Sequence, residues 1–151
     1  MTLHFRPPGH QRKLPAVPDQ RTELRQKIDA LPAELEKTIP NLDFTGGLAK
    51  IWEVIGLANK YIEGSKPWAL SKEGKTAELA TVMRDLLDAL RIAAFTVYPF
   101  MPATAEKMWS QLGLPEKLDS IKLAQIPSRA VFLDGAAVNK AQPLFPRIET
   151  K

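Results

Sequence analysis

The sequence predicts an all-α fold: a helical bundle of four to five helices with an irregular C-terminal tail. Apolar residues recur at three- and four-residue steps over most of residues 20–112, which is the period of amphipathic helices. Pro and Gly separate these stretches and mark where each helix ends. Of the 151 residues, 44% are hydrophobic and 25% are charged, a composition typical of a globular protein.

The first predicted helix covers the stretch that ends before Pro40. Its apolar positions are Leu24, Ile28, Leu31 and Leu35. Asp19 or Thr22 could cap its start, because a short side-chain oxygen can accept from the free N–H groups of the first turn. Pro32 lies inside this pattern, which predicts either one kinked helix or two short helices.

The second predicted helix has the clearest pattern, with Asp43 or Asn41 as its cap and Gly64 as its stop. Gly46 and Gly47 near its start predict a close approach to a neighbouring helix. One apolar stripe is expected to face the core, and Trp52 is expected to be buried with it. The stripe comprises Phe44, Leu48, Ile51, Trp52, Ile55, Ala58 and Ile62.

Residues 65–75 are predicted to form a loop with a short helical turn at 67–71, followed by a long helix over 76–98. The residues of this long helix expected to face inward are Leu79, Val82, Met83, Leu86, Leu87, Leu90, Ala94 and Val97. Pro102 opens a last helix that contains Trp109, also expected in the core, and Gly113 stops it.

The chain divides into three predicted regions. Residues 1–18 form a Pro-rich basic arm, residues 19–126 the helical bundle, and residues 127–151 an extended C-terminal tail. Within the tail, residues 130–133 are expected to form a strand that enters a turn. The extended apolar pair Leu144 and Phe145 is expected to leave a hydrophobic patch exposed.

The sequence offers little for catalysis or metal binding. There are no cysteines, and the two histidines, His4 and His10, lie in the first ten residues. Glycine-rich phosphate loops are absent, and the carboxylates Glu78, Asp85 and Asp88 are expected to form a solvated helix face. We therefore expect no catalytic residue, no metal site and no cofactor in this chain.

Charge and hydropathy restrict the partners and the location. The formal net charge is +4, which permits a polyanionic partner without requiring one. A bilayer crossing needs roughly 20 apolar residues, and the longest apolar stretch, 86–101, is interrupted by Asp88, Arg91 and Pro99. The expectation is a cytoplasmic protein with no membrane partner.

One segment has features of an RNA-binding site. Pro67 fixes the backbone next to Trp68, where a helix ends, so that the indole could be presented to a partner without a large ordering cost. An exposed aromatic ring among cations suits a splayed-out base. The nearby lysines are Lys60, Lys66, Lys72 and Lys75. By these arguments alone Trp68 could equally fill a gap in the core, and Asn59 could simply hold the backbone of the turn.

Several motifs resemble the anticodon-binding domain of methionyl-tRNA synthetases, which are class I aminoacyl-tRNA synthetases. They are Asp43-Phe-Thr, Leu48-Ala-Lys-Ile-Trp, Ala58-Asn-Lys-Tyr-Ile, Lys66-Pro-Trp-Ala-Leu, Tyr98-Pro-Phe-Met-Pro, Ala105-Glu-Lys-Met-Trp and Pro143-Leu-Phe-Pro-Arg-Ile-Glu, spread over residues 20–149. The resemblance implies that the domain binds initiator and elongator methionine tRNA. It implies that Trp68 stacks on the cytosine of the CAU anticodon, that Pro67 orients this ring, and that Asn59 lies at the helix end beside it. Lys60 and Lys66 are the candidate phosphate contacts.

The chain also departs from the family pattern. The Asn-x-x-x-Arg helix that opens the family's domain is absent, as are the His-x-Gly-His and Lys-Met-Ser-Lys-Ser signatures of its catalytic domain. The full-length enzyme would use ATP, whereas this chain is expected to carry no catalytic site and to depend on a separate catalytic domain or chain. Two alternatives stay open: a helical structural or protein-docking fragment that does not bind RNA, and the anticodon domain of a related class I synthetase.

Overall fold

The computed structural model describes residues 22–114, 117–122, 126, 138–140 and 142–145, and these residues fold into helices joined by short turns. The helices are α1 (Glu23–Thr38), α2 (Phe44–Ser65), α3 (Pro67–Lys72), α4 (Thr76–Val97) and α5 (Pro102–Gln111), with 3₁₀ turns η1 (Ile39–Asn41) and η2 (Leu118–Ser120). The described part contains no strand, so the predicted all-α class is confirmed. The expected arm at 1–18 and the expected strand at 130–133 lie outside the described residues.

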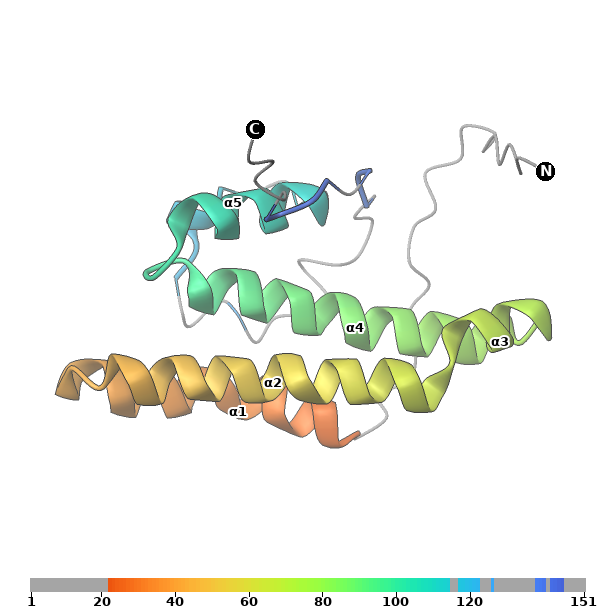
Figure 1. Ribbon diagram of the computed structural model, residues 1–151, viewed down its shortest axis with the longest axis horizontal. Helices are drawn as coiled ribbons and strands as arrows, with labels where there is room; N and C mark the ends of the chain where they lie inside the picture. Colours follow the sequence, from red (N-terminus) through yellow and green to blue (C-terminus); the bar gives the residue numbers. More distant parts are fainter. Residues whose placement is uncertain (1–21, 115–116, 123–125, 127–137, 141, 146–151) are drawn as a thin grey trace, which may run out of the picture.

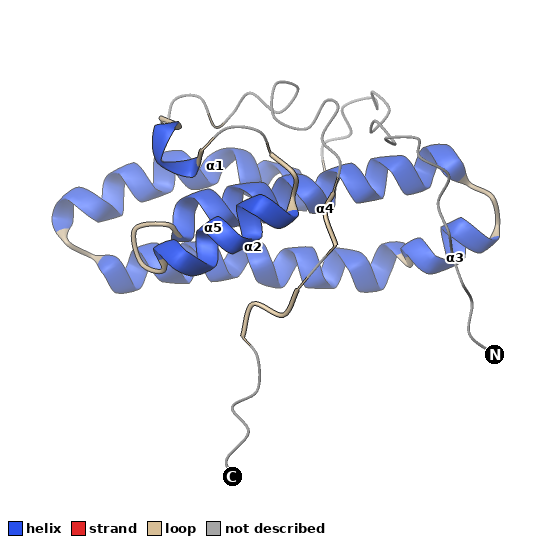
Figure 2. Ribbon diagram, turned by 90° about the horizontal axis from the view of Figure 1, so that it is seen from above, coloured by secondary structure: helices blue, strands red, loops and turns tan. Residues whose placement is uncertain are grey.

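Helix α4 is the centre of the bundle. It packs against α1, α2, α3 and α5, and α1 packs along α2. Figure 1 shows α1 and α2 side by side below α4, with α5 on the opposite side of α4. Figure 2, turned by 90°, shows α3 at the end of the bundle where α2 gives way to α4. The core is aliphatic, with Leu31, Ile51, Val54, Ile92 and Ala94 almost fully buried.

Helix α1 begins at the expected cap and runs through its proline. The hydroxyl of Thr22 accepts a hydrogen bond from the Arg25 amide at 3.2 Å. Pro32 lies inside the helix, so the stretch is one helix, not two. The apolar face that the sequence predicts, Leu24 to Leu35 at helical spacing, is buried against α2 and α4.

Helix α2 begins as predicted and ends later than predicted. Asp43 caps it by accepting from the Gly46 amide at 2.8 Å. A Cβ at Gly47 would lie 3.4 Å from the Thr38 hydroxyl, which confirms the close approach of α1 and α2 at this point. Gly64 is not the stop, because the helix continues to Ser65 and Lys66 adopts the left-handed conformation instead, with φ of 46°.

The prediction of a solvated acidic face on the helix over 76–98, which is α4, is wrong at two positions. Asp85 is 2% exposed and Asp88 is fully buried. Arg91 is also buried. Its Nη2 lies 2.6 Å from Asp88 Oδ1, and its Nη1 donates to the Ile126 carbonyl at 2.8 Å. A buried carboxylate is tolerable when a guanidinium balances its charge. Arg91 thereby also holds Ile126 against α4.

Arg91→Met should lower the free energy of unfolding by about 3–5 kcal/mol, because breaking a buried pair leaves one charge uncompensated. Urea unfolding followed by circular dichroism measures this change. The control is Lys107→Met, at an exposed lysine of α5, which should stay within about 0.5 kcal/mol. Equal stabilities for the two variants would contradict a structural role for the pair.

Candidate nucleic-acid interface

The corner between α2 and α3 is built by Lys66 and Pro67. Lys66 has φ of 46° and ψ of 60°, and it both ends α2 and begins α3. Its amide donates to the Ile62 carbonyl at 3.0 Å, and its carbonyl accepts from the Ala69 amide at 2.8 Å. Pro67 occupies the first turn of α3, where its missing N–H leaves no hydrogen bond unmade. The chain therefore changes direction within one residue.

Trp68 follows this corner and faces solvent, with 55% of its surface exposed. Leu70, two residues later, packs against the core, and α3 as a whole packs on α4. The six residues of α3 thus have one side on the bundle and present the indole on another. This exposure agrees with a binding platform and excludes the alternative that Trp68 fills a gap in the core.

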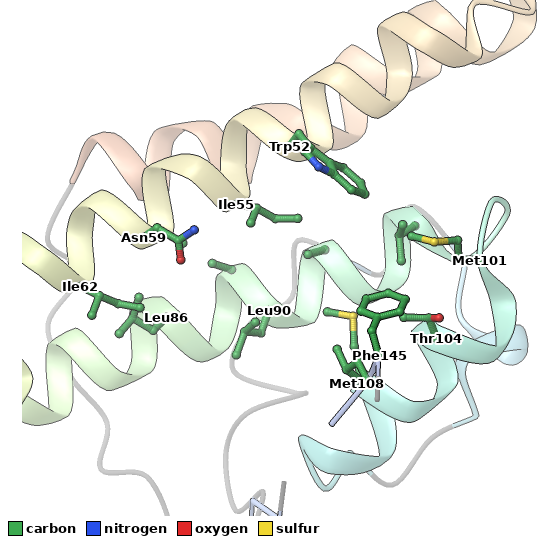
Figure 3. A pocket seen from close by; sticks show the side chains of 15 residues that line it. Trp52, Ile55, Asn59, Ile62, Leu86, Leu90, Met101, Thr104, Met108 and Phe145 are labelled. Atoms are coloured by element: carbon green, nitrogen blue, oxygen red, sulfur yellow. The ribbon is translucent and has the colours of Figure 1, made fainter. Parts of the chain in front are cut away.

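Asn59 lies on α2, on the face that leads to the corner. It is exposed, and Figure 3 shows it between Ile55 and Ile62 on the side that faces α4. Asn59 and Ile62 are three positions apart and follow one face of α2, which ends at Ser65, directly before Lys66. Over the seven residues from Asn59 to the corner, the helix rises about 10 Å.

The lysines named from the sequence do not all share this face. Lys60 lines a separate cavity of about 300 Å³ between α1 and α2, together with Glu23, Leu24 and Tyr61. Lys75 lies 3.0 Å from the Glu73 carboxylate, which raises the pKa of its ammonium group through a hydrogen bond and the opposite charge. Lys66 is exposed directly beside Pro67 and Trp68. Lys60 and Lys66 therefore have different surroundings: Lys60 borders the cavity between α1 and α2, and Lys66 is exposed at the corner.

An apolar groove of about 320 Å³ lies between α2, α4 and α5. Asn59 and Thr104 are its polar lining residues (Figure 3). The apolar lining residues are Trp52, Ile55, Ala58, Ile62, Leu86, Ala89, Leu90, Ala93, Val97, Met101, Met108, Leu144 and Phe145. Phe145 is 71% exposed, in agreement with the patch expected at Leu144 and Phe145.

The structure corrects four predictions of the core, two of them in this groove. Trp52 is 51% exposed and Leu90 is 47% exposed along the groove. Phe44 and Met83, also expected to face inward, are 50% and 38% exposed, whereas Trp109 is buried as expected. The apolar residues of α2 form two faces: Ile51 and Val54 enter the core, and Trp52 and Ile55, one position later, line the groove. This offset of one residue was the sequence signal for a second apolar face.

A buried polar cluster joins α1, α2 and α4. Arg25 Nη2 is 2.8 Å from Asp85 Oδ1, and the Tyr61 hydroxyl donates to Asp85 Oδ2 at 3.2 Å. The pKa of Tyr61 is raised, first by burial and then by the negative charge of Asp85.

Within the part of the chain that the structure describes, His, Asp and Glu side chains form no group of three that could hold a metal ion. In the same residues, no helix has the length and apolar character required to cross a membrane.

Comparison with known proteins identifies the family of this domain. The family model described as the anticodon-binding domain of tRNA ligase matches residues 22–146. The methionine–tRNA ligase of Fusobacterium nucleatum is 36% identical over 128 residues, which cover 84% of this chain and 20% of that protein. The methionine–tRNA ligase of Bacillus subtilis is 38% identical over 117 residues, 77% of this chain and 17% of that protein. The chain belongs to the anticodon-binding domains of the methionyl-tRNA synthetase family.

The fold of this domain is also found in solved members of the family. The apo form of Mycobacterium tuberculosis methionyl-tRNA synthetase superposes with a TM-score of 0.78 and 26% identity, over 92% of this chain and 28% of that one. The same enzyme in complex with methionyl-adenylate gives a TM-score of 0.72 and 27% identity, over 89% of this chain and 27% of that one. The domain thus spans about a fifth of the length of its curated relatives.

Acrylamide quenching of tryptophan fluorescence should separate the indoles of the domain. Trp52 and Trp68 should be quenched readily, and Trp109, which is 4% exposed, should be shielded. Trp68→Phe and Trp52→Phe should each remove an accessible component, and Trp109→Phe should remove the shielded one. A Trp52→Phe protein whose remaining fluorescence is entirely shielded would contradict the exposed position of Trp68.

Proposed function

We propose that this domain binds the anticodon loop of methionine tRNA, both initiator and elongator, and that Trp68 stacks on the cytosine of CAU. The observation that carries the proposal is an indole more than half exposed on a rigid corner of the backbone. An aromatic ring that is already in place binds a base without first having to be ordered. Membership of the methionyl-tRNA synthetase family supports methionine tRNA over the tRNA of a related class I synthetase.

The neighbouring residues receive distinct roles in this proposal. Pro67 fixes the direction in which Trp68 leaves the corner, and Asn59, exposed on the face of α2 that leads there, offers an amide to a base edge. The ammonium group of Lys66 contacts the phosphate next to the stacked base. Lys60, on a different face of α2, contacts a phosphate farther along the loop.

Catalysis is assigned to another part of the synthetase. About 80% of the length of the Fusobacterium nucleatum relative lies beyond the matched region, since the match covers 20% of it. We propose that a separate catalytic domain or chain uses ATP to attach methionine to the tRNA that this domain selects. The domain is proposed to act in the cytoplasm, where translation takes place.

A second candidate function, protein docking without RNA binding, is favoured by the apolar groove between α2, α4 and α5. Its exposed residues Trp52, Leu90 and Phe145 form an apolar surface that a helix of another domain could cover. Leu90→Glu should weaken association with a synthetase catalytic domain at least tenfold in a pull-down titration, because it places a charge in this surface. Unchanged association would exclude the groove as the docking site.

Trp68→Ala should weaken binding of a CAU anticodon stem-loop about 5- to 150-fold. This range corresponds to the roughly 1–3 kcal/mol that one stacked base contributes. Fluorescence anisotropy of a labelled stem-loop measures the affinity, and Trp68→Phe, which keeps an aromatic ring, should lose less.

A stem-loop carrying GAU is the matched RNA control. The unchanged domain should prefer CAU over GAU, and Trp68→Ala should reduce that preference. Equal affinities of the original domain and Trp68→Ala for the CAU stem-loop would overturn the stacking proposal.

A further inference from the structure

Three helices meet on one buried carboxylate at the end of the bundle that carries Trp68. Asp85 of α4 is 2% exposed, and its two oxygens have different partners. Oδ1 lies 2.8 Å from Nη2 of Arg25, in the first turn of α1, and Oδ2 accepts from the Tyr61 hydroxyl at 3.2 Å. Tyr61 lies four residues before Ser65, where α2 ends. The last turn of α2 is therefore tied to α4 by a hydrogen bond to a charged acceptor.

The position of Trp68 depends on this tie. Helix α3 has six residues and no side-chain cap, so it has little stability of its own. It is held by its packing on α4 and by the left-handed Lys66, which joins it to the end of α2. A shift of the α2 end against α4 would change the angle at this corner, and with it the orientation of Trp68 relative to Asn59.

We propose that Tyr61 is a positioning residue for anticodon recognition, whose hydroxyl fixes the α2 end on Asp85 and thereby sets the orientation of Trp68. This inference rests on the proposed function of Trp68. In this proposal Tyr61 acts without contacting the RNA, because its hydroxyl donates to the buried Asp85 carboxylate. Arg25 holds the other carboxylate oxygen, so that Asp85 stays oriented toward Tyr61.

Tyr61→Phe tests the proposal, because it keeps the ring and removes the hydroxyl that reaches Asp85. The ratio of the affinities for the CAU and GAU stem-loops should fall by about 2- to 30-fold, the range that is usual for residues acting through a neighbour. The slope of log affinity against log salt should not change, since no phosphate contact is lost. The matched control is Tyr98→Phe, at the second tyrosine of the chain and the opposite end of α4, which should leave the ratio unchanged.

A double variant shows whether Tyr61 acts through Trp68. In a Trp68→Ala background, Tyr61→Phe should have no further effect on the CAU to GAU ratio, because the ring that it positions is gone. An unchanged ratio in the single Tyr61→Phe variant, or the same additional loss in the Trp68→Ala background, would overturn the positioning role while leaving the stacking role intact. If Trp68→Ala itself binds like the original domain, the proposed function fails, and the role of Tyr61 fails with it.

Discussion

The buried carboxylate of Asp85 joins three helices of this bundle through its two oxygens. A carboxylate that is nearly inaccessible to water is costly unless its charge and its lone pairs are matched. Arg25 matches the charge from α1, and Tyr61 supplies a hydrogen bond from α2. The start of α1, the end of α2 and the first half of α4 are thereby held at fixed distances. The corner that carries Trp68 is built on this frame.

The corner itself has two local costs. Lys66 adopts a left-handed backbone conformation, which costs a non-glycine residue about 1–2 kcal/mol. Trp68 leaves more than half of a large apolar surface in water. Strain and exposure of this kind collect where binding requires a fixed geometry. An anticodon base that covers the indole would remove this apolar surface from water. The strain and the exposure together therefore favour a binding role over a purely structural one.

Local patterns in the sequence were sufficient for most of the fold. The caps at Thr22 and Asp43, the short helix after Pro67 and the apolar spacing of α1 and α4 all depend on residues within one or two turns of each other. Trp68 beside Pro67 was singled out in the same way, but the sequence left open whether the indole lies in the core. The resemblance to methionyl-tRNA synthetases favoured an exposed ring, and its 55% exposure in the structure excludes the core position.

The errors concern contacts between distant segments. Asp85 resembles a solvated residue when α4 is considered alone, because its partner Arg25 belongs to α1. Asp88 has its partner Arg91 one turn away on α4, but the sequence does not show that Ile126, far along the chain, packs on this pair and is bound by Arg91. Trp52 and Leu90 have core spacing, but they face a groove whose opposite side is formed by α5 and residues 144–145. Helical periodicity shows on which face of a helix an apolar residue lies. It does not show whether another element covers that face.

The most direct measurement of the central claim is the indole N–H signal of Trp68 in a two-dimensional ¹H–¹⁵N NMR spectrum during titration with a CAU stem-loop. The three tryptophans give three such signals, which Trp→Phe variants assign. A base stacked on Trp68 adds its ring current, so this signal should shift strongly while that of the buried Trp109 stays in place. A stem-loop that binds and leaves the Trp68 signal unmoved would contradict the account.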